Sequence, residues 1–143
     1  FIAINIEKSM MNNELGFARK VLEVIEKNGL GIEHMPSGID TLSVVIDGSN
    51  HDEDALERIV EGIKKVCQPD TIDVERNLAL IAVVGHGMSR KKGTAQKVCN
   101  SLYEADVNIR MIDQGSSELN IIIGVENKDY EKAISALYKE FLS

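Results

Sequence analysis

Tryptophan is absent from this 143-residue chain, and it has only two cysteines, two prolines and a 4% share of aromatic residues. Cys67 and Cys99 lie in helix-like segments without the close spacing of a zinc or redox motif, so we expect reduced thiols and a cytoplasmic protein. No apolar run reaches the roughly 18 residues that cross a bilayer, and no basic-then-apolar leader opens the chain. The formal charge of −7 argues against a nucleic-acid partner, because such partners are bound largely through lysine and arginine.

The residues that are present are those of a folded globular protein, with 43% hydrophobic and 27% charged residues. Phe1 already falls inside a predicted strand, with no initiator methionine and no lead-in before it. We therefore expect the sequence to be a fragment of a longer protein.

The chain contains a tandem sequence repeat. Gly16 aligns with Gly93, and the same offset of 77 positions aligns Ile32 with Ile109. Further matches at this offset pair Ile4, Met11, Ala18, Lys20, Val21, Gly38, Leu42 and Ile46 with Ile81, Met88, Ala95, Lys97, Val98, Gly115, Leu119 and Ile123. A repeat of this length predicts two domains, residues 1–76 and residues 77–143.

Each copy reads as strand, helix, strand, strand, helix, because apolar residues alternate in the strands and recur at helical spacing in the helices. In the first copy we expect strands over 1–7, 30–35, 42–46 and 71–74 and helices over 16–28 and 52–66. In the second copy we expect strands over 78–84, 107–112 and 119–125 and helices over 94–105 and 128–142. This pattern predicts the α+β class, with two ferredoxin-like βαββαβ units in tandem and helices on one face of each antiparallel sheet.

The second copy lacks its own last strand, because the sequence stops at Ser143 directly after the final helix. An open sheet edge is usually paired or covered. We therefore expect the missing strand to come from the segment upstream of Phe1 or from a neighbouring molecule.

No group of residues predicts catalysis. His34, His51 and His86 are scattered, and no metal-binding spacing of histidines or cysteines occurs, so we expect no metal site. Gly85-His86-Gly87 followed by Arg90-Lys91-Lys92 resembles a fragment of a phosphate loop, but the spacing fits neither the Walker nor the dinucleotide pattern. We interpret this stretch as a solvated loop.

The junction between the first strand and the first helix is the most informative region. Backbone N–H groups near Gly16, Phe17 and Ala18 lie at a predicted helix N-terminus and could hold a carboxylate. Glu33, on the following strand, could accept hydrogen bonds from an ammonium group, so the two would suit an amino acid with a cationic side chain. The alternative, that Gly16 is only a turn residue and Glu33 a solvated carboxylate, stays open from spacing alone.

Three strings of residues stand out. They are Met11-Asn12-Asn13-Glu14-Leu15-Gly16-Phe17, His34-Met35-Pro36-Ser37-Gly38-Ile39-Asp40 and the thirteen residues from Asn108 to Asn120. Together they resemble the C-terminal regulatory region of aspartate kinase, which consists of two ACT domains, and the resemblance covers essentially the whole chain. It implies feedback control of an enzyme that phosphorylates L-aspartate with ATP in the biosynthesis of lysine, methionine and threonine. The kinase domain, with its ATP and Mg²⁺, would lie upstream, and no cofactor is expected in this region.

The resemblance also implies an effector site at an interface between ACT domains. On one side the site would be lined by Met11, Gly16, Phe17 and Ala18, with backbone amides holding the effector carboxylate. On the other side it would be lined by Gly31, Ile32 and Glu33, with Ser37 and Gly38 nearby. This chain has Glu33 where lysine-sensitive relatives often have aspartate and Gly38 where they have serine, which weakens a carry-over of individual side-chain contacts.

Lysine is the effector that Glu33 favours, and threonine is the second choice. The position equivalent to Glu33 in the second copy is Arg110, which would repel an ammonium group. We therefore expect the first copy to bind the effector and the second to build a homodimer, mainly through Asn108, Ile109, Arg110, Met111, Ile112, Asp113 and Gln114. Two alternatives are a module that only dimerises the kinase and, with less support, a free-standing enzyme on a ferredoxin-like fold.

Overall fold

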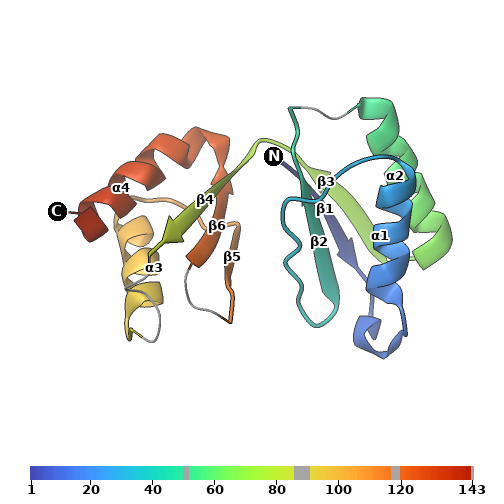
Figure 1. Cartoon of the computed structure of the whole chain (residues 1–143), viewed down its shortest axis with the longest axis horizontal. Helices are drawn as coiled ribbons and strands as arrows, with labels where there is room; N and C mark the ends of the chain where they lie inside the picture. The colour runs from blue at the N-terminus through green and yellow to red at the C-terminus, as the bar shows by residue number, and fades with distance from the viewer. Residues whose placement is uncertain (50–51, 86–90, 117–119, 143) are drawn as a thin grey trace. The chain divides into compact units, whose positions relative to one another are not determined.

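The computed structural model describes residues 1–49, 52–85, 91–116 and 120–142. The chain divides into two compact units, Phe1–Arg76 and Asn77–Ser143, each with its own sheet and its own pair of helices (Figure 1). Within the described residues, no helix is long and apolar enough to cross a membrane. His51, His86 and the Gly87–Arg90 part of the basic loop lie outside the described residues, as does the expected strand start at Leu119.

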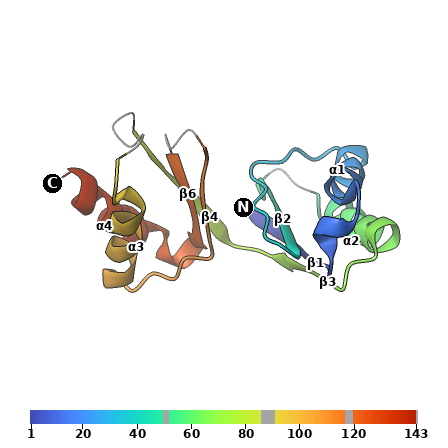
Figure 2. The same cartoon turned by 90° about the horizontal axis from the view of Figure 1, so that it is seen from below.

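The first unit contains a three-stranded antiparallel sheet in the order β2-β1-β3, with the central β1 pairing on both sides. Helices α1 and α2 pack side by side on one face of this sheet (Figure 2). In chain order its elements are β1 (Ile2–Glu7), the 3₁₀ turn η1 (Met11–Asn13), α1 (Phe17–Lys27), β2 (Thr41–Ile46), α2 (Glu53–Cys67) and β3 (Thr71–Glu75).

Alternate residues of β1 and β2 point into the core of the first unit, as the period of a half-buried strand requires. In α1 the buried residues recur three or four positions apart, so a single face of the helix meets the sheet. The α2 helix begins at a regular cap, since the side chain of Asp52 accepts a hydrogen bond from the Asp54 N–H at 2.9 Å. The core consists of Ile2, Ile4, Ile6, Met11, Phe17, Val21, Val24, Ile25, Leu42, Val44, Ile46, Leu56, Ile59, Ile63 and Cys67.

The second unit repeats the plan with a three-stranded sheet in the order β4-β6-β5. Its elements are β4 (Leu78–Val84), α3 (Thr94–Glu104), β5 (Met111–Gln114), β6 (Asn120–Glu126), the 3₁₀ turn η3 (Asn127–Asp129) and α4 (Tyr130–Leu142). The core, on the face that α3 and α4 cover, consists of Ala79, Ile81, Val98, Leu102, Val107, Ile121, Ile123, Val125, Ala133 and Leu137. The α+β, ferredoxin-like arrangement predicted from the sequence is confirmed, with two corrections.

The first correction concerns the expected strand over 30–35, which is an irregular edge segment. It joins β2 through isolated bridges, His34 to Val45 and Ser37 to Leu42. The N–H groups of Glu33 and His34 both donate to the Val45 carbonyl oxygen, at 2.8 and 3.4 Å. Two residues facing one is the geometry of a β-bulge, which breaks the regular ladder.

The second correction has a cause that both copies share. The expected strand over 107–112 begins only at Met111 and continues to Gln114. The Val107 N–H donates to the Leu102 carbonyl at 3.0 Å, after Asp106 with φ 58°, which closes a Schellman motif at the end of α3. Leu30 donates to Ile25 in the equivalent way at the end of α1. The first residue of each expected strand therefore completes the preceding helix.

In the described residues of the second unit, β4 pairs with β6 on one side and has no partner strand on the other. The expected fourth strand is thus not supplied by the described part of the chain. That it comes from upstream or from a neighbouring molecule stays a prediction.

Candidate functional site

A surface pocket of about 350 Å³ lies in the first unit, between the beginning of α1 and the hairpin that leads into β2. Six of the nine residues predicted for the effector site line it, namely Met11, Gly16, Phe17, Ala18, Ser37 and Gly38. The remaining lining residues, to which the sequence analysis assigned no role, are Asn12, Glu14, Arg19, Met35, Thr41 and Leu42. Glu14 is the one carboxylate among these described lining residues.

The other three predicted residues, Gly31, Ile32 and Glu33, are exposed and do not line this pocket. Glu33 is held at the bulge opposite Val45. Val45 is three residues along β2 from Leu42, which lines the pocket, so the bulge lies roughly 10 Å farther along the strand. Within one chain, the structure therefore does not bring Glu33 together with the beginning of α1.

One wall of the pocket is the N-terminus of α1. Gly16 is the N-cap residue, with φ 74° and ψ 15°, and no side chain caps the helix. The Phe17 N–H donates to the Glu14 carbonyl at 3.4 Å, whereas the N–H groups of Ala18 and Arg19 belong to the first turn, which has no acceptor within the helix. Donors of this kind bind anions such as carboxylates.

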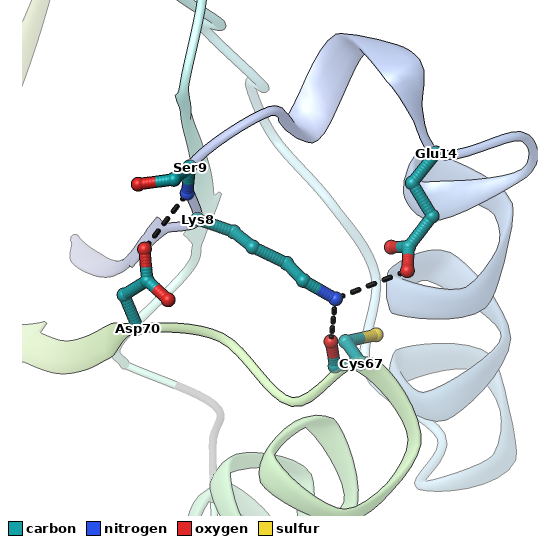
Figure 3. Close-up of polar contacts among 5 residues, drawn as sticks. All are labelled: Lys8, Ser9, Glu14, Cys67 and Asp70. Carbon is teal, nitrogen blue, oxygen red and sulfur yellow. Dashed lines mark hydrogen bonds and ion pairs between the residues drawn. The ribbon is translucent and has the colours of Figure 1, made fainter.

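Behind this wall, Lys8 at the end of β1 contacts the loop before α1 and the end of α2 (Figure 3). Its Nζ donates to Glu14 Oε1 at 3.0 Å and to the Cys67 carbonyl at 2.6 Å, and lies 5.6 Å from the centre of the Phe17 ring. The side chains of Lys8 and Glu14 are 21% and 31% exposed, so their ion pair is partly shielded from water. The end of β1 is thereby tied to the loop before α1 and to the end of α2.

The neighbouring Ser9 and Asp70 strengthen the same corner (Figure 3). The Ser9 N–H donates to Asp70 Oδ2 at 2.8 Å, and this bond is the main cause of the lowered pKa of Asp70. The Asp70 N–H in turn donates to the Glu7 carbonyl at 2.8 Å. The segment that follows β1 is therefore fixed to the connection between α2 and β3. Burial raises the pKa of the nearby Cys67 thiol, which keeps it protonated at neutral pH.

Comparison with known proteins agrees with this arrangement. Residues 81–141 match the ACT domain family. Over all 143 residues the chain is 41% identical to aspartokinase 3 of Bacillus subtilis (strain 168). The matched region is 100% of this chain and 32% of that protein. The chain corresponds to the ACT-domain regulatory region of aspartokinases.

Solved structures extend the likeness of this regulatory region to three dimensions. The aspartate kinase of Clostridium acetobutylicum, described as an allosteric enzyme, matches 98% of it with a TM-score of 0.92 and 49% identity. Escherichia coli aspartokinase III, solved in complex with lysine and aspartate, matches 99% of it with a TM-score of 0.79 and 20% identity, a likeness of fold. The region spans about a third of these proteins, 32% and 31% of the respective chains.

The second unit of the regulatory region contains a pocket of about 320 Å³ near the beginning of α3. Its lining includes Lys91, Lys92 and Lys97 and, from the end of α4, Glu140. The α3 helix begins there as α1 does, with Gly93 as an N-cap residue at φ 88° and no side-chain cap. Lys91 is the residue that the repeat aligns with Glu14. Among the described residues of either unit, no three His, Cys, Asp or Glu side chains come together as metal ligands.

The residues predicted to form a dimer interface lie at the outer edge of the second sheet. Met111, Ile112, Asp113 and Gln114 make up β5, which pairs with β6, and no strand among the described residues pairs with its other edge. The Arg110 N–H donates to the Gly124 carbonyl at 2.7 Å, and Ile109 packs against the core. Asn108 is exposed. Met111–Gln114 thus form the edge strand and Asn108–Arg110 lead into it, and the contact of these seven residues with a second copy stays a prediction.

Proposed function

We propose that this regulatory region binds an end-product amino acid, lysine first and threonine second, in the pocket at the beginning of α1. The observation that carries the proposal is the pairing of anion-binding N–H groups with the Glu14 carboxylate in one cavity of about 350 Å³. A free amino acid has one group for each, a carboxylate and an ammonium. The presence of lysine in the E. coli aspartokinase III structure supports lysine as the first choice.

In the full-length protein, binding would inhibit a cytoplasmic kinase that phosphorylates L-aspartate with ATP, whose active site lies outside this region. An effector inhibits only if it binds one arrangement of the enzyme more tightly than another. Coupling between two sites amounts typically to about 1–3 kcal/mol. The bonds from Lys8 and Ser9 to the segment between Cys67 and Asp70 would carry a change at the pocket toward β3, the last strand of the first unit.

A second copy of the chain completes the proposal. Because Gly31, Ile32 and Glu33 are exposed and lie outside the pocket of their own chain, they would line the effector site of a dimer partner. Among the described residues, no strand pairs with the outer edge of β5, which leaves this edge available for such an association. The alternative function is a module that dimerises the kinase and binds no effector.

A ligand-induced thermal shift separates these two functions. Lysine at about 100 times its dissociation constant should add roughly 2.7 kcal/mol to the free energy of unfolding, because it binds only the folded state. The measurement is the melting temperature of the regulatory region with lysine, with threonine and with glutamate as a control of the wrong side-chain charge. If neither lysine nor threonine at millimolar concentration raises the melting temperature, the dimerisation module is the better description.

Glu33 provides a test of whether a dimer partner contributes to the effector site. Glu33→Ala is expected to weaken lysine binding about tenfold, because a charged hydrogen bond is lost, while binding of norleucine, which lacks the side-chain ammonium, stays unchanged. Glu57→Ala, an exposed acid on α2, serves as the control. Titration calorimetry gives the affinities and sedimentation gives the oligomeric state. Equal lysine affinity in Glu33→Ala and the unchanged chain would remove Glu33 from the site.

A further inference from the structure

The ammonium group of Lys8 links the loop before α1 to the end of α2. Its Nζ donates to Glu14 Oε1 at 3.0 Å and to the Cys67 carbonyl oxygen at 2.6 Å (Figure 3). Cys67 is the last residue of α2, and the last carbonyls of a helix have no N–H partner within the helix. The helix dipole also favours a cation at this end. One group thus serves both segments, so neither can shift without changing a bond to the other.

Backbone strain flanks both ends of this link. Four residues other than glycine have a positive φ in the described part of the chain, and two of them lie here. Met10, with φ 64°, follows shortly after Lys8, and Gln68, with φ 50°, comes directly after Cys67. A left-handed backbone is unfavourable for residues with a Cβ, and it persists where the surrounding structure holds it. The strain therefore marks a corner that other bonds keep in place.

Hydrogen bonds on either side hold Met10 in this conformation, since the residue itself is 65% exposed. The Ser9 N–H donates to Asp70 Oδ2 at 2.8 Å, and the Met11 N–H donates to the Lys8 carbonyl at 3.1 Å. Met11 lines the pocket, and Asp70 leads directly into β3. The loop thus has a strained arrangement, in which these bonds tie the pocket lining to the start of β3, and can relax when they break.

The second unit lacks this link, because the repeat aligns Lys8 with Gly85, which has no side chain. In the first unit, the segment that Lys8 holds leads into β3. After Arg76 and Asn77 the chain continues from β3 as β4 of the second unit. Lys8 therefore lies between the pocket and the chain connection that joins the two units.

We propose that Lys8 couples the occupancy of the pocket to the position of β3, as a positioning residue that does not touch the effector. The proposal rests on the proposed function, and it names the residue on which regulation through that site depends. A ligand in the pocket contacts the loop that contains Glu14 and so fixes where Glu14 holds Nζ. Through its bond to the Cys67 carbonyl, Nζ then selects one of the two arrangements at the start of β3. Lys8 itself is not among the described residues that line the pocket.

The test separates binding from coupling in the full-length kinase. Lys8→Met keeps most of the length of the side chain and removes the ammonium group. Lys27→Met is the matched control, because the Lys27 side chain is 72% exposed and pairs with Glu23 of the same helix. Titration calorimetry gives the affinity for lysine, and a kinase assay gives the activity that remains at saturating lysine. If circular dichroism shows that Lys8→Met does not fold, Lys8→Gln, which keeps a polar end, takes its place in both measurements.

In Lys8→Met we expect the lysine affinity to stay within about fivefold, while the activity that remains at saturating lysine rises at least about fivefold, because a bound effector inhibits only through coupling. Lys27→Met should match the unchanged enzyme in both measurements. A purely structural role of Lys8 would weaken binding and leave the activity at saturating lysine unchanged. Equal activity at saturating lysine in Lys8→Met and the unchanged enzyme would therefore overturn the assignment of Lys8. Failure of the unchanged enzyme to bind lysine would overturn the proposed function itself.

Discussion

Gly16→Val is expected to abolish measurable lysine binding, with a loss of affinity of more than about a hundredfold. Gly16 has φ 74°, a left-handed conformation that a β-branched residue adopts only with strain, at a cost of about 1–2 kcal/mol or more. Release of that strain rotates the N-cap and turns the N–H groups of Ala18 and Arg19 away from the pocket. The loss of two hydrogen bonds to a carboxylate, each worth about 1.5–3 kcal/mol, accounts for the expected factor.

Gly93→Val is the matched control for this experiment. Gly93 has the same role at the start of α3, with φ 88°, and a Cβ there meets no atom of the described residues within 4 Å. Both variants should therefore lose similar stability, measured by chemical denaturation, while only Gly16→Val should lose lysine binding in calorimetry. Normal lysine affinity in Gly16→Val would mean that the carboxylate is not held at the beginning of α1.

Ile59→Ala is expected to lower the free energy of unfolding by about 2–5 kcal/mol. Ile59 lies on the sheet-facing side of α2 and is fully buried in the core of the first unit. Truncation removes buried methyl groups and leaves a cavity between the helix and the sheet. For a unit of this size, each kcal/mol corresponds to about 4–8 °C, so the melting temperature should fall by at least about 8 °C.

Ile39→Ala tests whether burial is the cause. Ile39 is 77% exposed, and its truncation should change the free energy of unfolding by less than about 0.5 kcal/mol. Hydrogen exchange measured residue by residue should show the lost protection of Ile59→Ala in residues 1–76, because the core that contains Ile59 has no residue of the second unit. A loss below about 1 kcal/mol in Ile59→Ala would contradict this account of the core.

Periodicity was enough to predict most helices and strands, because buried faces repeat along the chain. The segments after α1 and α3 were predicted wrongly, since Leu30 and Val107 are apolar and resemble strand residues although they close Schellman motifs. A Schellman motif requires a residue in the left-handed conformation directly before Leu30 or Val107. Gly29 signals it, but Asp106 with φ 58° does not, because aspartate adopts that conformation only occasionally.

The residues of the candidate site were likewise only partly predictable from the sequence. Gly16, Phe17 and Ala18 were predicted because a helix N-terminus is visible in the order of residues. The place of Glu14 in the pocket lining was missed, although it stands in the Met11–Phe17 string, because an acid in a loop normally indicates a solvated side chain. Its setting depends on Lys8 and on the carbonyl of Cys67, and a contact between residues 59 positions apart leaves no periodic signal.

The sheet of the second unit has consequences for how copies of this region assemble. Among the described residues, β4 (Leu78–Val84) and β5 each have β6 as their one partner strand, and β4 has no charged side chain. Two such edges on one unit would allow β4 of one copy to pair with β5 of the next, and this head-to-tail pairing does not close a ring. A strand that covers β4 would block this pairing, and assembly through β5 would then stop at the dimer.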